Sequence, residues 1–514
     1  MKQPTRREVL QTLVASSALA ACGEAGPGLA DATTASDAGP DVAQTCLPVG
    51  AGSQVSHGPI SGAVTDQSLT ISLRCTGPAK VQLELQPLGG GAVLRSGCTH
   101  AAEADDFAVR LQVNGLPAGQ RYLVTPLLDD VPQPAHAIQT HTFPSVGKVT
   151  AFSFCFGSCQ RHGGGNKGNS LGKTYDVVAA LAERPQFFAQ IGDWTYPDYL
   201  FSAQGGLDQD GNNYTVFPEK LRESWHRRMD PSYPMRKVLQ QVPLAHVWDD
   251  HDFAENNGHR DVTGSQAARV DAFARYLPTW PLAKSKGGVW QRFAVGHVDF
   301  WLADMRSQRT DQSKAVVKET DGEGKVTKLR FVEPPDHTLL GEEQLKWLLD
   351  GLRASKAMWK VVFFPVEVNP RYDLILNLGI KLKYGLVVEA AADGWAGYPS
   401  ERKQLLDLHK SGEVKNLLFL TGDAHQASMK ERDAECPPVF MAANLDIGQA
   451  PVVDLMEDFG IPRGDVWPYW TQDASGLNTV GRVQFVTEPK HEVWCDALDQ
   501  NGVLLKRMVV PLQT

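Results

Sequence analysis

Four short segments carry oxygen, nitrogen and sulfur donors directly after apolar runs of the chain. They are Gly157-Ser158-Cys159-Gln160, Gly192-Asp193-Trp194-Thr195-Tyr196, Trp248-Asp249-Asp250-His251-Asp252 and Gly422-Asp423-Ala424-His425. Carboxylate, imidazole, thiolate and phenolate groups bind metal ions. A pair of bound metal ions can hold a phosphoryl group and activate water against it. The four segments therefore have the layout of a two-metal phosphoesterase site.

The apolar runs that precede these donors are expected to be buried strands. Residues 149–156, 186–191, 243–247 and 414–420 are short and rich in Val, Ile, Leu or Phe. Such runs are typical of strands buried on both faces. In an α/β sheet the loops after the strands meet at the carboxyl edge, where ligands bind. Donors that are far apart in the sequence are therefore predicted to converge in space.

The pattern of elements changes once along the chain. Residues 57–147 alternate polar and apolar positions between Gly and Pro punctuation, which predicts a small β-sandwich domain. Residues 148–514 combine apolar strands with helical patterns, which predicts a layered α/β catalytic domain with mixed sheets and flanking helices. Within it, residues 480–511 alternate again around an Asn501-Gly502 turn and should add antiparallel strands. A chain of 514 residues suits two domains with appendages.

The N-terminal residues are expected to direct export. Residues 1–22 resemble a twin-arginine signal, with Arg6-Arg7 before a short apolar stretch. Cys22 follows Leu19-Ala20-Ala21 as in a lipobox, so lipidation of Cys22 is predicted; a plain cleavage site is the alternative. Residues 23–56, rich in Ala, Gly, Asp, Thr and Pro, are predicted to be a disordered tether. These features predict export by the twin-arginine machinery and a lipoprotein anchored to a membrane, facing the periplasm or the cell exterior.

Charge and cysteine content narrow the partners and the compartment. The net charge of −9 argues against non-specific nucleic-acid binding, which needs Lys and Arg to neutralise phosphates. Cysteines in an exported chain suggest disulfides. Cys75 with Cys98 is the expected pair, because both fall in the β domain, and Cys436 with Cys495 is a second candidate.

The donor segments resemble the PhoD-type alkaline phosphatase and phosphodiesterase family, from about His57 to the C-terminus. Further matching segments are Asp304-x-Arg306-Ser307, Gln344-x-x-Trp347-Leu348, Trp359-Lys360 and Asp393-Gly394-Trp395-x-Gly397-Tyr398-Pro399. The resemblance implies an exported phosphoesterase that hydrolyses phosphate esters with metal-activated hydroxide. A phosphate mono- or diester is the expected substrate.

The resemblance also implies ferric iron and calcium as cofactors. Thiolate, phenolate and imidazole suit iron, whereas carboxylate and amide oxygens suit calcium. The expected iron ligands are Cys159, Tyr196 and His425, the expected calcium ligands are Asp249, Asn256 and Asp423, and Asp193 is expected to bridge the two ions. Other divalent metals, such as zinc or manganese, are the alternative.

Three residues are expected to act in catalysis. Asp193 fixes the metals, and His251 is the candidate for protonating or hydrogen-bonding the leaving oxygen. Arg306 either orients a site loop or pairs with phosphate, and a structural salt bridge is the equal alternative. The basic residues Arg222, His226, Arg227 and Arg228 are expected to form a solvated helix face.

Two other functions stay open from the sequence. One is a phospholipase D-like phosphodiesterase of the same family. The other is a non-catalytic surface-binding lipoprotein whose metal site is structural. Single donors also have structural interpretations: an Asp after a strand can cap the next helix, Cys159 can be a buried thiol, and Tyr196 can be a core aromatic residue.

Overall fold

The computed structural model describes most of the chain beyond the predicted tether. The described residues are 46–50, 52–160, 172–194, 196, 225–226, 228–254, 256–262, 266–283, 287–382, 385–447, 463–470 and 477–513. The predicted export signal, Cys22 and the tether up to residue 45 lie outside them. Among the described residues no helix is both long and apolar enough to cross a membrane.

A nine-stranded mixed sheet carries three of the four donor segments, in the order β24-β23-β22-β10-β11-β12-β1-β2-β6. Its centre consists of parallel strands β10 (Phe152–Gly157), β11 (Phe188–Ile191) and β12 (Leu244–Val247), and every residue of the three is buried. The antiparallel strands predicted near the C-terminus are confirmed as β22 (Thr479–Val486), β23 (Glu492–Asp499) and β24 (Leu504–Pro511).

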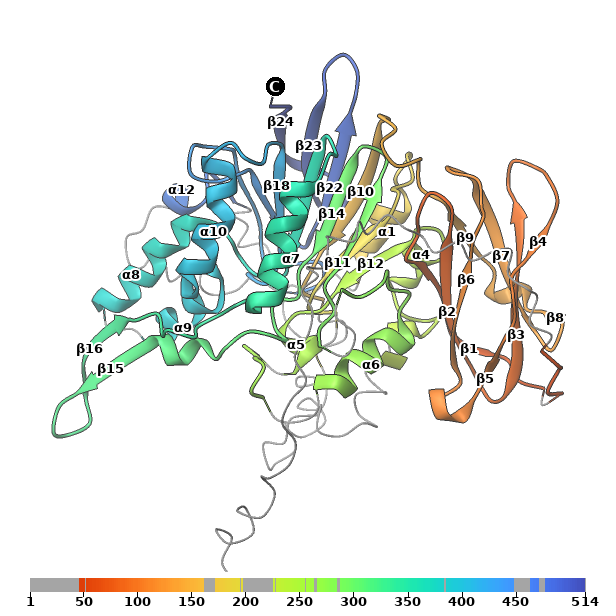
Figure 1. The fold of residues 1–514 in the computed structure, drawn as a ribbon, viewed down its shortest axis with the longest axis horizontal. Helices are drawn as coiled ribbons and strands as arrows, with labels where there is room; N and C mark the ends of the chain where they lie inside the picture. The colour runs from red at the N-terminus through yellow and green to blue at the C-terminus, as the bar shows by residue number, and fades with distance from the viewer. Residues whose placement is uncertain are drawn as a thin grey trace, which may run out of the picture. The chain divides into compact units, whose positions relative to one another are not determined.

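A seven-stranded sheet carries the fourth donor segment. Its order is β13 (Gln291–Val295), β14 (Val298–Leu302), β17 (Trp359–Phe364), β18 (Leu417–Thr421), β20 (Val439–Ala442), β19 (Ala427–Lys430) and β21 (Tyr469–Trp470). Strands β14, β17, β18 and β20 are parallel. Figure 1 shows the two large sheets at the centre of the described part of the chain.

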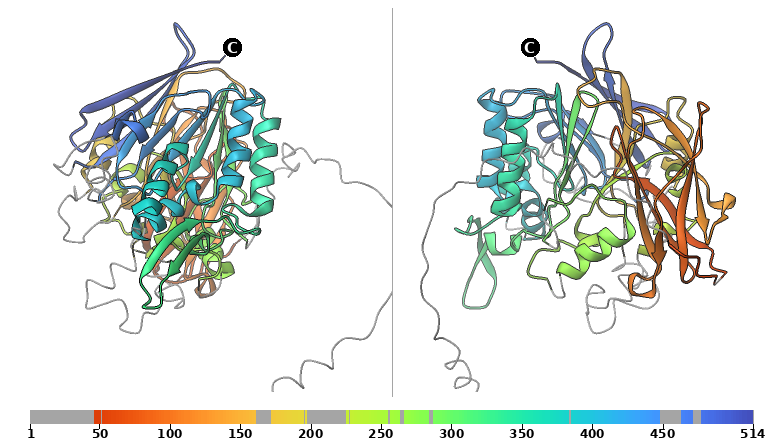
Figure 2. Two further views of the ribbon diagram at one scale, coloured as in Figure 1. Left: turned by 90° about the vertical axis from the view of Figure 1, so that its left-hand side faces the viewer. Right: turned by 45° about the vertical axis from the view of Figure 1, so that its right-hand side comes forward.

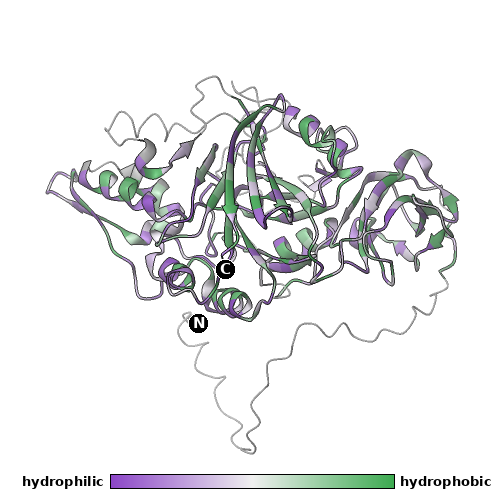
Figure 3. Ribbon diagram, turned by 90° about the horizontal axis from the view of Figure 1, so that it is seen from above, coloured by the Kyte–Doolittle hydropathy of each residue, from purple (hydrophilic) through white to green (hydrophobic). Residues whose placement is uncertain are grey.

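The two faces of the seven-stranded sheet pack against different layers, as the period of two along a strand requires. In β17, Val361 and Phe363 belong to the core shared with the nine-stranded sheet, whereas Val362 and Phe364 belong to a core that includes helices. Those helices are α7 (Gly341–Ala354) and α10 (Pro399–Lys410), which lie side by side (Figure 2). The strands between these layers are coloured largely hydrophobic in Figure 3. This mixed, layered α/β arrangement is the fold class predicted from the sequence.

The N-terminal strands are continuous with the nine-stranded sheet. Strand β1 (Val55–Gly62) runs parallel to β12 through the pair Gly62 and Leu244, and β2 (Leu69–Cys75) and β6 (Ala108–Val113) follow it outward. A Cβ at Gly62 would lie 2.6 Å from the Leu244 carbonyl oxygen, so glycine permits this close approach. The other N-terminal sheet consists of β3 (Ala79–Pro87), β4 (Leu94–Arg95), β5 (Thr99–Ala101), β7 (Arg121–Leu128), β8 (Val131–Pro132) and β9 (Ile138–His141).

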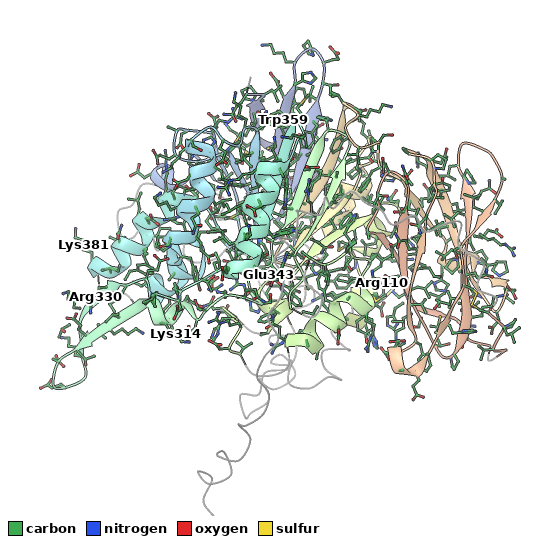
Figure 4. The ribbon with its side chains drawn as sticks, viewed as in Figure 1. Arg110, Lys314, Arg330, Glu343, Trp359 and Lys381 are labelled. Carbon is green, nitrogen blue, oxygen red and sulfur yellow. A yellow bond between two sulfur atoms is a disulfide. The ribbon has the colours of Figure 1, made fainter. Side chains whose placement is uncertain are left out.

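Further α-helices and a two-stranded ribbon accompany these sheets. They are α1 (Lys173–Ala179), α4 (Arg236–Leu239), α5 (Asp250–Phe253), α6 (Gln266–Tyr276), α8 (Asp373–Leu382), α9 (Gly385–Asp393), α12 (Arg463–Val466), β15 (Val316–Thr320) and β16 (Val326–Phe331). Arg110 of β6 lies beside α6 (Figure 4) and donates to the carbonyl oxygens of Ala274 and Thr279 at 2.6 and 3.3 Å. These bonds join the N-terminal strands to the helix that follows the third donor segment.

The expected disulfide pairs are wrong. Cys98 is bonded to Cys46, while Cys75, Cys436 and Cys495 are buried free thiols. Cys75 is fully buried at the end of β2, whereas Cys98, its expected partner, is only half-buried. Cys46 lies in the predicted tether, but the chain at this point is held to the N-terminal strands: the Asp129 carboxylate accepts the backbone N–H groups of residues 49 and 50 at 2.8 and 3.0 Å.

Candidate metal centre

The four donor segments occupy equivalent places in the fold. Cys159, Asp193, Asp249 and Asp423 each stand two residues beyond the last residue of their strand, which is β10, β11, β12 and β18 respectively. The strands belong to two different sheets that share one core. The carboxyl ends of these strands therefore deliver the donors to one place, as predicted.

Most of these donors sit on backbone that ordinary residues rarely adopt. The φ angles of Cys159, Asp193, Asp423 and His425 are 61°, 55°, 70° and 51°. The left-handed region costs a non-glycine residue about 1–2 kcal/mol, and such residues cluster at functional sites. The loops hold one another there, because the Cys159 N–H donates to the Gly192 carbonyl at 3.2 Å and the Gln160 N–H to the Asp193 carbonyl at 2.9 Å.

The glycine of each Gly-Asp pair permits two loops to touch. Gly192 has a φ of 106°, and a Cβ there would collide with the Cβ of Asp249. A Cβ at Gly422 would lie 2.7 Å from both the Pro365 carbonyl oxygen and the Ser158 hydroxyl. Glycine is thus required at both positions, because any side chain would overlap atoms of the neighbouring loop.

The potential metal-binding atoms form three overlapping groups. In each group the ligand atoms lie within 4.8 Å of one another; the groups are Cys159–Asp193–His425, Asp193–Asp250–His251 and Asp193–Asp249–Asp250–Asp423. Asp193 is a member of all three, which is the place that a bridging ligand requires. Its Oδ2 accepts the Tyr196 hydroxyl at 2.7 Å and lies 3.6 Å from the Cys159 sulfur.

The carboxylates of this cluster outnumber the arginine that pairs with them, which is Arg306. Burial, reinforced by neighbouring carboxylates, raises the pKa of Asp193 and of Asp423 well above the ordinary value. Burial also raises the pKa of Asp249 to about 7, against the opposing charge of Arg306. Asp193 Oδ1 and Asp249 Oδ2 are buried and have no hydrogen-bond partner among the described residues. Buried carboxylate oxygens without donors fit bound cations, so the residues present suit the metals that the family resemblance implies.

Asp250 belongs to this cluster although it was not among the expected ligands. Burial alone would raise its pKa, but the charges of Arg306 and His251 outweigh that effect and lower it. Its carboxylate also accepts the backbone N–H groups of His251 and Asn257 at 2.8 and 2.6 Å. The signal was present in the sequence, because Asp250 directly follows Asp249 at the sheet edge.

Arg306 is wholly buried, and its donors face carboxylates. Its Nε donates to Asp249, and its two terminal nitrogens donate to the two oxygens of Asp393 at 3.1 Å each. Arg309 also donates to Asp393, at 2.7 Å. Of the roles that the sequence left open for Arg306, this geometry corresponds to the salt bridge. Asp393 was missed as a functional residue, although the matching Asp393-Gly394-Trp395 segment contained it.

The remaining predicted residues differ in position. Tyr196 is buried, and its ring centroid lies 4.4 Å from that of His251, which is also buried. His425 is half-buried beside Cys159. Asn256 is exposed just beyond α5, and no hydrogen bond joins its side chain to the described carboxylates. The structure thus gathers the predicted donors apart from Asn256.

One prediction for the basic segment is wrong. Arg228 is only 4% exposed and donates to the Tyr233 hydroxyl at 2.6 Å, so it does not belong to a solvated face. Tyr233 lies beyond the helical pattern from which the exposure of Arg228 was predicted. Arg222 and Arg227 lie outside the described residues.

Comparisons with known proteins agree with this geometry. The family model described as PhoD-like phosphatase matches residues 154–446. Alkaline phosphatase D of Bacillus subtilis (strain 168) is 24% identical over 360 residues, which are 65% of this chain and 56% of that protein. The chain thus spans little more than half the length of this curated relative in the alignment.

Two solved structures share the fold. One, titled "Structure of PhoD", has a TM-score of 0.63 and 19% sequence identity, with coverage of 89% of this chain and 92% of that one. The other is purple acid phosphatase PPD1 from yellow lupin (Lupinus luteus) seeds, with a TM-score of 0.57, 10% identity, and coverage of 88% and 74%. The family model covers more than half of the chain, including the loops after β10, β11, β12 and β18, and the chain therefore belongs to the PhoD-like phosphatase family.

Proposed function

We propose that the protein is an exported, metal-dependent phosphoesterase of the alkaline phosphatase and phosphodiesterase type. The observation that carries this proposal is the cluster of buried carboxylates around Asp193, whose unpartnered oxygens stand at the carboxyl ends of the strands. Family membership and fold both point to a phosphoester hydrolase. The match to a phosphatase family favours this proposal over the alternative of a non-catalytic lipoprotein.

The proposed ligands follow the groups that the structure brings together. Cys159, Tyr196 and His425 would hold ferric iron, and Asp193 would bridge to calcium held by Asp249 and Asp423. Asp250 adds a further oxygen beside these carboxylates. The exposed Asn256 would have to turn inward to join them. Iron and calcium follow from the family resemblance, and the donor chemistry fits both.

The residues of the chain have separate tasks in the proposed hydrolysis. Bound cations would acidify the attacking water and neutralise the phosphate oxygens. His251 is the group that would donate a proton to the leaving oxygen, because it lies in the cluster beside Asp193 and Asp250. Arg306 would act through Asp249: its Nε bond fixes one carboxylate oxygen, and the other is buried without a hydrogen-bond partner among the described residues.

Export and membrane attachment are further parts of the proposal. The Cys46–Cys98 disulfide supports an oxidising compartment, because disulfides are rare in reducing cytosol. The twin-arginine-like residues and the lipobox before Cys22 support export by the twin-arginine machinery and a lipid anchor. The predicted tether of residues 23–56 would join the anchor to the N-terminal strands, to which the Cys46–Cys98 disulfide binds it.

Phosphate ester hydrolysis by the purified protein lacking residues 1–22 tests the proposal. A chromogenic phosphodiester and the matching monoester are compared before and after chelation, with metal content measured on the same samples. We expect chelation-sensitive turnover, and the ratio of the two rates separates a phosphatase from a phosphodiesterase of the phospholipase D-like kind. Asp176→Asn, at an exposed position on α1, is the matched control and should keep full activity. Turnover that persists in fully metal-free protein would overturn metal dependence.

A further inference from the structure

A second charged feature lies at the opposite end of the strands that carry the metal centre. A hollow of about 220 Å³ is lined by Arg121, Arg184 and Gln241, with an apolar wall that includes Val178, Leu181 and Val242. Arg184 precedes β11 and Val242 precedes β12, whereas Asp193 and Asp249 follow the same two strands. The hollow is therefore at the amino edge of the sheet, away from the carboxylates.

The two arginines come from different regions and meet at one amide. Arg121 begins β7 of the N-terminal strands, and Arg184 lies between α1 and β11. Both donate to Oε1 of Gln139, at 3.1 and 2.8 Å. Arg184 also donates to Oε1 of Gln241, at 3.1 Å. Figure 1 shows α4 between β12 and β9, and the Gln139 N–H donates to the Gln240 carbonyl at 2.8 Å, so the two regions are in contact here.

Among the described residues, the two guanidiniums have amides as side-chain partners. In the part of the chain that the structure describes, no Asp or Glu forms an ion pair with Arg121 or Arg184, and their side-chain partners are neutral amides. The local field is positive: burial, reinforced by Arg121, lowers the pKa of Arg184. Burial, reinforced by Arg184, lowers the pKa of the adjacent His141 to about 4 and keeps that imidazole neutral. Two positive charges that lie close together without a counter-charge repel each other, and a bound anion would lower that repulsion.

We propose that the Arg121–Arg184 hollow is a binding site for a small tetrahedral oxyanion, of which inorganic phosphate and sulfate are the simplest members. A guanidinium carries five N–H donors in a planar fork that matches phosphate oxygens. The side-chain hydrogen bonds of Arg121 use one of its terminal nitrogens, and those of Arg184 use each of its terminal nitrogens once, so both groups keep N–H donors for an anion. The hollow has room for such an ion beside the neutral Gln241 amide.

An anion at this site would join the N-terminal strands to the catalytic region. It would accept hydrogen bonds from Arg121 of β7 and from Arg184 before β11, and it would relieve the repulsion between them. The site does not depend on the proposed hydrolysis, because its residues lie at the opposite sheet edge from the metal ligands. Binding of an anion that favours the folded state should also raise the melting temperature.

Calorimetric titration of the full chain with sulfate, and then with phosphate, tests the proposal. Arg184→Gln and Arg121→Gln should each weaken binding at this site at least about tenfold, since each removes a charge-assisted contact. Arg95→Gln is the matched control, an exposed arginine of the same N-terminal region that already pairs with Glu84 at 3.1 Å. Asp193→Asn separates the two sites, because it disturbs the metal centre and leaves the hollow intact.

Charge reversal supplies a second, independent measurement. Arg184→Glu would place a carboxylate beside Arg121, so it should abolish anion binding here and raise the melting temperature in anion-free buffer. Arg95→Glu should do neither. The proposal would be overturned if both Arg→Gln variants bound sulfate and phosphate as the wild type does. It would also be overturned if Asp193→Asn removed all binding, because the anion would then belong to the metal centre.

Discussion

The two edges of the β10–β11–β12 layer carry opposite charges, and they differ in the burial and the backbone conformation of the charged residues. At the carboxyl edge the carboxylates of Asp193 and Asp249 are buried, and several donors have left-handed backbone. At the amino edge Arg184 is half-buried and Arg121 is exposed, and neither has a positive φ. Both edges gather like charges. At the carboxyl edge Arg306 pairs with part of them, whereas Arg121 and Arg184 have no ion-pair partner among the described residues.

The difference in burial determines how much each edge depends on a bound ion. Electrostatic interactions strengthen as the local dielectric falls, so the buried carboxylates repel one another more strongly than the guanidiniums do. Of these charged residues, those at the carboxyl edge, Cys159, Asp193 and Asp423, have positive φ, whereas Arg121 and Arg184 do not. A cation at the carboxyl edge should therefore be essential to function, whereas an anion at the amino edge should adjust stability.

The largest effect is expected for Asp193→Asn. Asp193 is shared by all three groups of donors, so its loss removes one oxygen from each. Metal content and phosphate ester hydrolysis should both fall by more than the 10- to 100-fold that is typical of residues one step outside the ligands. Elemental analysis and turnover on the same sample check this, and retention of both would refute the bridging role.

Arg306→Met should have the next largest effect. It leaves Asp249 and Asp393 buried without their shared cation, which costs about 3–5 kcal/mol when one partner of a buried pair is removed. Urea unfolding of the metal-free protein measures the loss. The matched control is Arg353→Met, because Arg353 pairs with Glu413 on the surface and such pairs contribute about 0–1 kcal/mol. Equal losses of stability in the two variants would contradict the stabilising role of the Arg306 ion pairs with Asp249 and Asp393.

The metal-free protein should lose stability as pH rises from about 6.5 to 8. Burial raises the pKa of Asp249 to about 7 and that of Glu367 to about 8, so the folded state keeps protons that the unfolded state has released. Unfolding then releases protons, and the free energy of unfolding falls with pH across this window.

Thermal melting across this pH window tests that sign. The slope should become shallower in Glu367→Gln and when metal is bound. His57, His141 and His246, whose pKa values burial lowers to about 4, contribute the opposite slope mainly below pH 6.5, and this contribution fades across the window as the unfolded imidazoles lose their protons. A melting temperature that rises from pH 6.5 to 8 in metal-free protein would contradict the buried, protonated carboxyls.

The smallest catalytic effect is expected at the amino edge. Arg184→Gln should change hydrolysis less than about twofold, because charge effects over this separation are screened. It should weaken anion binding nonetheless, which makes the two edges separable by experiment. A large loss of turnover in this variant would show that the edges are coupled.

The sequence predicted the carboxyl edge well because its signals are local. Each donor stands just after the end of an apolar strand. The sequence alone therefore assigns Cys159, Asp193, Asp249 and Asp423 to one edge of the sheets. The layered α/β class followed from the same strands. Asp250 was omitted because Asp249, Asp250 and Asp252 stand in one short segment. The sequence does not show which of these carboxylates face the cluster.

Features that depend on pairing across the fold could not be read in this way. The amino-edge hollow joins Arg121 to Arg184, and nothing in their separate segments indicates that they meet. The disulfide partner of Cys98 was missed for the same reason, since Cys46 lies in a segment whose composition suggested a tether. The exposure of Arg228 was predicted wrongly because Tyr233, its partner, lies outside the helical pattern.

Anomalous scattering from crystals of the metal-loaded protein would test the central claim most directly. The account predicts two metal peaks at the carboxyl edge, both in contact with Asp193, with one beside Cys159 and His425 and the other beside Asp249 and Asp423. Absorption edges would identify the elements. A single peak that does not contact Asp193, or no peak in protein that hydrolyses phosphate esters, would contradict the account.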